Sequence, residues 1–274
     1  MFYQKHLPNL PLSNYVESII YIEGNNKGTG LPKTAMSLVF NLEDSFKLYT
    51  DKQFTQFIDY KKYWVAGLQT KPTNVESYGT SKMVVVQFKT LGAFIFLNDP
   101  LHHYTDNYIP LDAVFNNLAC NTWEQLLEAQ TIRDRITITE KFLQHQLSTR
   151  KLPGKKLVST IALLSDCSHN LTINEICRIS GISRKHLNNL SKEYTGVSPK
   201  MLASLNRLQS SLKTISSAKA GKLSDVAYEL EYFDQAHFNN DFKRFTDLKP
   251  TEYVKLTEHI PSLKQVPHFI PFQL

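Results

Sequence analysis

The sequence predicts an α+β protein with a β-rich first half and an all-helical second half. Residues 15–90 contain short runs rich in β-branched and aromatic residues that are separated by turn residues. After Pro110 the apolar residues recur every three or four positions, which is typical of amphipathic helices. Charge divides the chain near residue 150, because residues 1–150 hold 14 basic and 14 acidic residues and the remainder holds 31 − 14 = 17 basic and 25 − 14 = 11 acidic residues. The helical half therefore carries the whole net charge of +6, which favours an anionic partner such as nucleic acid.

Composition narrows the class of protein. The chain has 274 residues, of which 42% are hydrophobic and 20% charged, as in soluble globular proteins. No apolar run approaches 18 residues, so a membrane-spanning helix is not expected. The start, MFYQKHLPNLPL, lacks the apolar core of a secretory signal, which predicts a cytoplasmic protein. Cys120, Cys167 and Cys177 show no paired spacing and are expected to be reduced thiols.

The β-rich half is predicted to be a sandwich or a cupin-like barrel. Five strands are expected, at residues 15–24, 35–43, 46–51, 63–70 and 82–90. Turn residues at 24–30 and 70–74 separate some of them, and five or more such runs are typical of closed or double-layered β-folds.

Two helices are expected to flank the strands, at residues 110–130 and 137–147. The second is our candidate for a homodimer contact, through Ile138, Phe142 and Leu143. Pro153 and Gly154, within 148–156, mark the best domain boundary. The predicted units are a sensor or dimerisation domain at 1–149, a helical domain at 155–256 and a C-terminal tail at 257–274.

The helical half contains a repeat. Residues 175–199 and 225–250 align at an offset of 50 at first and 51 later, where Leu187 matches Phe238 and Pro199 matches Pro250. Each copy predicts a helix, a short turn and a second helix, and a linker helix at 200–215 joins the copies. The expected helix caps and turn residues are Thr172 with Glu175, Gly181, Ser183, Ser224 and Asp234. A helix–turn–helix unit of this kind can place its second helix in a DNA major groove.

The second helix of each copy has one apolar and one polar side. Phe238, Phe242 and Phe245 fall on one stripe, and in the first copy Leu187, Leu190 and Tyr194 do the same. The opposite sides carry amides and cations, which can pair with adenine, guanine or phosphate. Contact with phosphates is expected from Lys192, Lys243 and Arg244.

The region from about 155 to 256, which contains both modules and the linker helix, resembles the double helix–turn–helix domain of AraC/XylS transcription regulators. The first module resembles the pattern I-A-x-x-x-G-x-S-x-x-x-L through Ile176, Cys177, Gly181, Ser183 and Leu187. The linker helix resembles R-L-x-x-A through Arg207, Leu208 and Ser211. The second module resembles F-S-D-Q-S-x-F-x-x-x-F-K-K-x-x-G-x-x-P-x-x-Y through Tyr232, Phe233, Asp234, Gln235, Ala236, Phe238, Phe242, Lys243, Arg244, Pro250 and Tyr253.

The resemblance implies specific base-facing residues. They are Arg184, Lys185, Asn188 and Asn189 in the first recognition helix, and Gln235, Ala236, His237, Asn239 and Asn240 in the second. The chain departs from the family at Asn189 and Asn240, which stand where arginine is frequent, at Glu231 and Asp247, which replace turn glycines, and at Ser191, which replaces an aromatic residue.

Three functions remain open. The leading one is a sequence-specific, effector-responsive DNA-binding transcription regulator of bacterial type, without enzymatic activity, cofactor or metal. Its expected partners are double-stranded DNA, a small-molecule effector, RNA polymerase and a second copy of the chain, and no membrane. The alternatives are a β-domain enzyme targeted to DNA by its helices and a protein-binding adaptor. Adjacent His102 and His103 make a poor metal pair, and no HExxH or GxSxG motif occurs.

Overall fold

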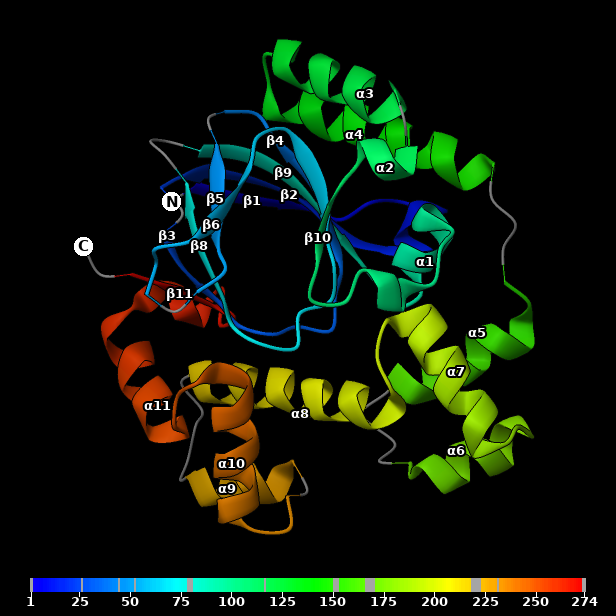
Figure 1. Ribbon diagram of the computed structural model, residues 1–274, viewed down its shortest axis with the longest axis vertical. Coiled ribbons are helices and arrows are strands. Elements are labelled where there is room, and N and C mark those ends of the chain that lie inside the picture. Colours follow the sequence, from blue (N-terminus) through cyan, green and yellow to red (C-terminus); the bar gives the residue numbers. More distant parts are fainter. Residues whose placement is uncertain are drawn as a thin grey trace.

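The N-terminal part is a β-sandwich of two antiparallel sheets (Figure 1). The computed structural model describes residues 2–25, 27–43, 45–51, 53–77, 81–115, 117–149, 153–165, 171–217, 223–230 and 232–272. The first sheet has the order β1 (Phe2–His6), β2 (Val16–Gly24), β9 (Ser81–Phe88), β4 (Ser37–Asn41), β7 (Tyr63–Ala66) and β10 (Tyr108–Pro110). The second has the order β11 (Phe269–Pro271), β3 (Lys27–Gly30), β8 (Thr73–Ser77), β5 (Phe46–Tyr49) and β6 (Phe57–Tyr60).

The central strand β4 shows why the first sheet has two covered faces. All five of its residues are buried, because alternate side chains point to opposite faces of the sheet and both faces are covered. Phe40 packs against Phe142 of a covering helix, with ring centroids 5.8 Å apart. Val39 points between the sheets, toward the cluster that contains Phe46 and Trp64. A strand covered on both faces reads as a continuous apolar run rather than an alternating one.

The predicted strands are confirmed as β2, β4, β5, β7 and β9. The turn predicted at 24–30 is wrong in its second half, where Lys27–Gly30 form β3. Gly28 permits a close approach rather than a turn, because a Cβ there would lie 2.3 Å from the carbonyl oxygen of Ile270. Strands β1, β6, β8 and β10 were not expected from the pattern, and β11 corrects the prediction that the second half is all-helical.

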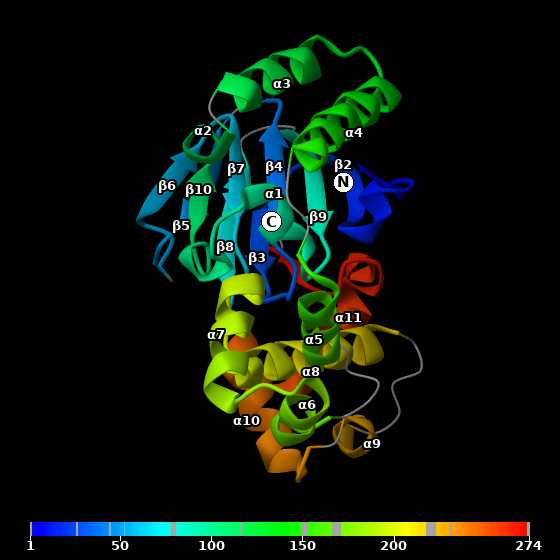
Figure 2. The same cartoon turned by 90° about the vertical axis from the view of Figure 1, so that its right-hand side faces the viewer.

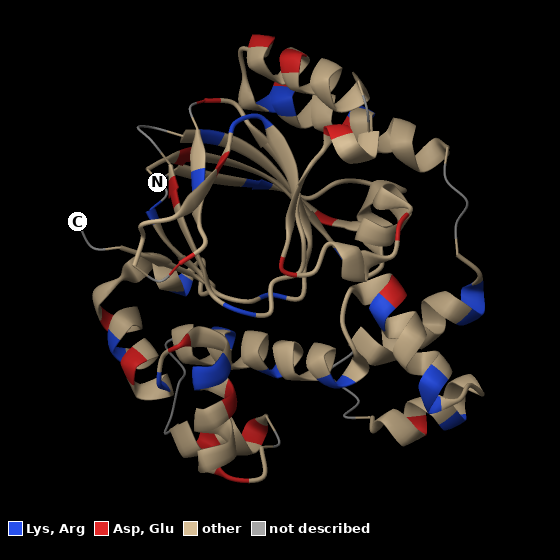
Figure 3. Cartoon of the chain, in the orientation of Figure 1, with Lys and Arg blue, Asp and Glu red and all other residues tan. Residues whose placement is uncertain are grey.

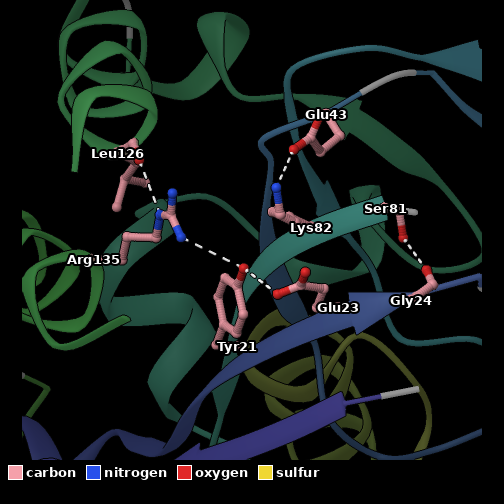
Figure 4. Close-up of polar contacts among 8 residues, drawn as sticks. All are labelled: Tyr21, Glu23, Gly24, Glu43, Ser81, Lys82, Leu126 and Arg135. Atoms are coloured by element: carbon pink, nitrogen blue, oxygen red, sulfur yellow. Dashed lines mark hydrogen bonds and ion pairs between the residues drawn. The ribbon is translucent and has the colours of Figure 1, made fainter. Parts of the chain in front are cut away.

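Four helices cover the outer face of the first sheet, namely α1 (Gly92–Leu97), α2 (Asp112–Phe115), α3 (Asn117–Glu128) and α4 (Ile132–Ser148). The two predicted helices are confirmed, although α4 begins earlier, with Thr131 as its N-cap. Figure 4 shows how α4 is fastened: the Arg135 side chain donates to the Leu126 carbonyl oxygen at 3.2 Å and to the Tyr21 hydroxyl at 3.5 Å. Tyr21 in turn donates to Glu23 at 3.0 Å.

The predicted dimer contact on α4 is wrong for two of its residues. Phe142 is 5% exposed and Leu143 is 0% exposed, because both face the sheet of their own chain. Phe142 also contacts the ring of Phe115 at 5.3 Å. These side chains are occupied within the fold and are not available to a second copy.

The C-terminal part is helical and lies at the end of the sandwich opposite α3 and α4 (Figure 2). Its helices are α5 (Lys155–Ser165), α6 (Ile173–Ser180), α7 (Arg184–Thr195), α8 (Pro199–Ser216), α9 (Leu223–Glu229), α10 (Gln235–Thr246) and α11 (Pro250–His259). Short 3-10 helices occupy Leu12–Asn14, Leu101–His103 and Pro261–Lys264. Among the helices of the described residues, none combines the length and apolar character needed to cross a membrane.

The residues after α11 return to the sandwich. β11 pairs with β3 in antiparallel register, with Phe269 opposite Gly30 and Pro271 opposite Gly28. Figure 1 shows α11 and β11 running from the helical part up to the edge of the second sheet. The C-terminal end of the chain thus adds a strand to a sheet built from the N-terminal half.

Candidate nucleic-acid interface

Two helix–turn–helix modules, α6–α7 and α9–α10, lie at opposite ends of the linker helix α8 (Figure 1). Their second helices begin in the same way. The Ser183 side chain accepts a hydrogen bond from the backbone of His186 at 3.2 Å, and Asp234 accepts one from His237 at 2.7 Å. Both residues were predicted as N-caps and both are confirmed at the offset of 51.

The second helices also end in the same way. Gly196 (φ 88°) and Asp247 (φ 60°) both adopt left-handed backbone conformations at the C-caps. Thr195 donates to the carbonyl oxygen of Ser191 at 2.7 Å, and Thr246 donates to that of Phe242 at 2.7 Å. Aspartate tolerates the left-handed region better than most residues other than glycine, so the second module keeps the turn without a glycine.

The first helices differ more. Thr172 and Glu175 form the predicted capping box, and Gly181 ends α6 with φ 66°. Hydrogen bonds from Thr172 lower the pKa of Glu175. The prediction for Ser224 is wrong, because this residue lies inside α9 rather than before it. Glu231, in the turn of the second module, lies outside the described residues.

The predicted apolar stripe of α10 is confirmed. Phe238, Phe242 and Phe245 are each at most 1% exposed. The Phe242 ring lies 5.8 Å from that of Phe238 and 5.7 Å from that of Tyr253 in α11. Of the three stripe residues predicted in α7, Leu187 is fully buried, whereas Leu190 and Tyr194 are half-buried. Tyr194 instead packs on Phe94 of the sandwich part, with ring centroids 4.2 Å apart.

The opposite faces of both helices are open to solvent. Of the predicted contact residues, those exposed are Arg184, Lys185, Asn189, Lys192, Gln235, Ala236, His237, Asn240, Lys243 and Arg244. Asn188 and Asn239, which correspond at the offset of 51, are half-buried. Figure 3 shows lysine and arginine positions on both modules and on α8. The structure therefore brings the predicted residues of each module onto one accessible helix face.

Two of the cations are held by neighbours. The Arg184 guanidinium donates to Asn174 Oδ1, at 2.8 Å from Nε. Arg244 lies 3.9 Å from Asp241, one turn earlier in α10. Arg184 and Asn188 also line an open groove of about 510 Å³ with Lys200 of α8.

One ion pair was missed by the sequence analysis. Arg207 of α8 lies 3.7 Å from the Asp241 carboxylate of α10, and its guanidinium stacks over the Tyr232 ring at 5.2 Å. These contacts set the position of the second recognition helix against the linker helix. Arg207 was identified only as part of a pattern, and nothing in the spacing pointed to Asp241 as its partner.

A second candidate site lies between the two sheets. The cavity there has a volume of about 370 Å³. Its walls are mainly apolar and include Val39, Phe46, Trp64, Val75, Met83 and Phe269. Among its polar lining residues are Lys33 and His268, which come from the two ends of the chain.

Both basic groups of the cavity are affected by burial. Burial lowers the pKa of Lys33, whose ammonium makes a long hydrogen bond of 3.5 Å to Ser37 and has no carboxylate within ion-pair distance among the described residues. Burial and the charge of Lys33 lower the pKa of His268 to about 3, so this imidazole is neutral at pH 7. No group of three or more His, Cys, Asp or Glu suited to a metal ion occurs among the described residues.

Comparisons with known proteins match the two parts separately. Residues 176–256 match the family model of a helix–turn–helix domain, and residues 4–110 match a domain of unknown function, DUF6597. An uncharacterized HTH-type transcriptional regulator of Haemophilus influenzae is 28% identical over 105 residues, which cover 38% of this chain and 35% of that protein. The match thus spans about a third of that relative.

Among solved structures, ToxT from Vibrio cholerae O395 is 13% identical, with a TM-score of 0.46, and the match covers 92% of this chain and 97% of that chain. Wild-type ToxT from Vibrio cholerae strain SCE256, solved with a bound unsaturated fatty acid, is 15% identical, with a TM-score of 0.44 and coverage of 85% and 93%.

Proposed function

We propose that residues 176–256, which match the family model of a helix–turn–helix domain, are of the AraC type, and that the chain is a sequence-specific, effector-responsive DNA-binding transcription regulator. The observation that carries the proposal is the equivalence of the two modules. Both recognition helices begin and end with the same hydrogen bonds, bury one stripe and leave the amide and cation face open. Two equivalent faces that carry amides and cations favour a DNA-binding protein over a protein-binding adaptor.

The separation of the modules supports binding to one face of the duplex. The 18 residues of α8 span about 27 Å at 1.5 Å per residue. Successive major-groove segments on one face lie about 34 Å apart, and the modules extend beyond the ends of α8. We therefore expect both recognition helices to enter the same side of the DNA, one helical turn apart.

The residues of each face are assigned by chemistry. Lys192, Lys243 and Arg244 lie at the last turns of the recognition helices and are suited to phosphates. Gln235 and Asn239 lie one turn apart near the start of α10, where side chains reach base edges. Their amides can pair with adenine, which would make them the residues that select sequence.

Salt dependence of binding tests the DNA proposal. Full-length protein should bind duplex DNA with an affinity that falls steeply as salt rises, because phosphate contacts release counterions. Lys243→Ala should weaken binding to all sequences and flatten the salt slope by about one. Lys141→Ala, which removes an exposed lysine from α4, is the matched control and should leave both unchanged. Binding that ignores salt, or an equal effect of the two variants, contradicts the proposal.

The effector is proposed to bind between the sheets and to combine an apolar body with one acidic group. The cavity walls are mainly apolar, and the Lys33 ammonium is buried there without an ion-pair partner among the described residues. A bound anion would offset the cost of burying that charge.

An apolar anion tests this assignment. Anilinonaphthalenesulfonate should become fluorescent on binding the wild type, and Lys33→Met should weaken that binding. Lys5→Met is the control, because Lys5 also lines the cavity but is 40% exposed and lies 3.8 Å from Glu17. Equal binding by the wild type and Lys33→Met would refute the acidic-group requirement.

A further inference from the structure

The C-terminal segment 265–271 connects the second helix–turn–helix module to the sandwich. It follows α11, and the Tyr253 hydroxyl of that helix donates to the carbonyl oxygen of Pro267. Tyr253 is also the residue on which Phe242 of the recognition helix α10 packs. Any displacement of this segment therefore acts on the packing beneath the second recognition helix.

The same segment is built into the second sheet. The Leu31 backbone donates to the His268 carbonyl oxygen at 2.7 Å, and the Phe272 backbone donates to that of Lys27 at 2.9 Å. Between them β11 forms its register with β3. The rings of Phe272 and Phe54 meet with centroids 5.0 Å apart. These contacts close the edge of the sheet, which would otherwise present unpaired backbone groups.

The segment also forms part of the cavity wall. Gln265, Val266, His268 and Phe269 line the cavity together with Lys33 and Trp64 from the sandwich. A molecule that fills the cavity would therefore contact both the sandwich and the segment that follows α11. Occupancy and the position of the segment are linked, and such linkage is reciprocal.

We propose that residues 265–271 are a strap that holds the second module against the sandwich and restrains DNA binding until the strap is released. The first module has its own attachment, because Thr105 donates to the Gly196 carbonyl oxygen at 2.7 Å. With both modules fixed to one body, the recognition helices cannot adjust their relative position to two groove segments. Release of the strap frees the second module from the sandwich. This proposal rests on the proposed DNA-binding function.

Strand β3 offers a pair of substitutions that separate strap docking from other effects. The three heavy atoms nearest to a Cβ on Gly28 would all belong to the strap: Ile270 O at 2.3 Å, the Phe269 ring at 2.8 Å and Pro271 Cα at 2.9 Å. A Cβ on Gly30, two residues along the same strand, has Thr73 O at 3.7 Å as its nearest neighbour. Gly28→Ala should thus expel the strap, whereas Gly30→Ala is its matched control.

Full-length proteins are compared in two measurements. Hydrogen exchange followed by mass spectrometry reports whether residues 265–271 are docked, and titration with a mixed-sequence DNA duplex at low salt reports affinity. We expect Gly28→Ala to exchange faster in the strap and to bind DNA about fivefold tighter or more, the lower range of coupling between sites. Gly30→Ala should match the wild type in both.

A freed strap with DNA affinity equal to or below that of the wild type overturns the proposal. If Gly28→Ala leaves the strap docked, the DNA affinity of a chain that ends at Val266 is measured instead. Tighter binding than the wild type supports the strap, and equal or weaker binding overturns it. Failure of every form to bind DNA contradicts the proposed function itself, whereas equal binding by all forms contradicts the strap alone.

Discussion

Replacing Phe242 with alanine should unfold the second recognition helix from its module. The side chain is 1% exposed and lies between Phe238 of its own helix and Tyr253 of α11. Removal of a fully buried phenylalanine ring costs about 3–5 kcal/mol, through lost burial and the cavity that remains. This is a large fraction of the stability of an ordinary domain, about 5–15 kcal/mol.

The neighbouring Phe233 provides the control for the same chemical change. It is 93% exposed, just before the N-cap of α10. Phe233→Ala should change stability by less than about 0.5 kcal/mol, as surface substitutions usually do. The two variants delete the same ring, so any difference between them reports burial rather than side-chain type.

Segment-resolved hydrogen exchange is the suitable assay, because a chain of two parts need not unfold in one step. Amides of α10 should exchange roughly a hundredfold faster or more in Phe242→Ala, since each 1.4 kcal/mol is about tenfold. Amides of the sandwich strand β9 should be unaffected. An increase below about tenfold in α10, or an equal increase in Phe233→Ala, would refute the burial account of this helix.

Three further outcomes are expected. Asp234→Ala should destabilise α10 by about 1 kcal/mol, because the backbone of His237 loses its acceptor, and thermal melting of this variant against the wild type measures the loss. Asn239→Ala should cost about 1–3 kcal/mol on the preferred DNA site and relax preference at one or two base pairs, and unchanged selection from random duplexes would show that it is not a reader. Burial lowers the folded pKa of His268 to about 3, against 6.5 unfolded, so docking of the strap carries no protonation cost above pH 6.5 and becomes progressively less stable as pH falls toward 3. At pH 5 the loss is up to about 2 kcal/mol, seen as faster exchange of 265–271 that His268→Gln should abolish.

The helical part was largely predictable from the sequence, because its signals are local. Ser183 and Asp234 lie three residues before the amides they cap, and Phe238, Phe242 and Phe245 recur at helical spacing within one element. The offset of 51 then placed equivalent residues at equivalent positions in both modules. A linear pattern suffices wherever the partners of an interaction lie within one or two helical turns of each other.

Partners that are distant in sequence were decided only by the tertiary structure. The pairing of β3 with β11 joins residues separated by about 240 positions. Gly28 of β3 was predicted to lie in a turn, but the structure shows that it allows the close approach of Ile270. Phe142 was predicted to contact a second copy of the chain but packs against Phe40 of its own chain. Lys33 and His268 share a cavity although they come from opposite ends of the chain. Hydrophobic periodicity tells which face of an element is buried, but the surface that covers it depends on strand pairing and packing that no local spacing records.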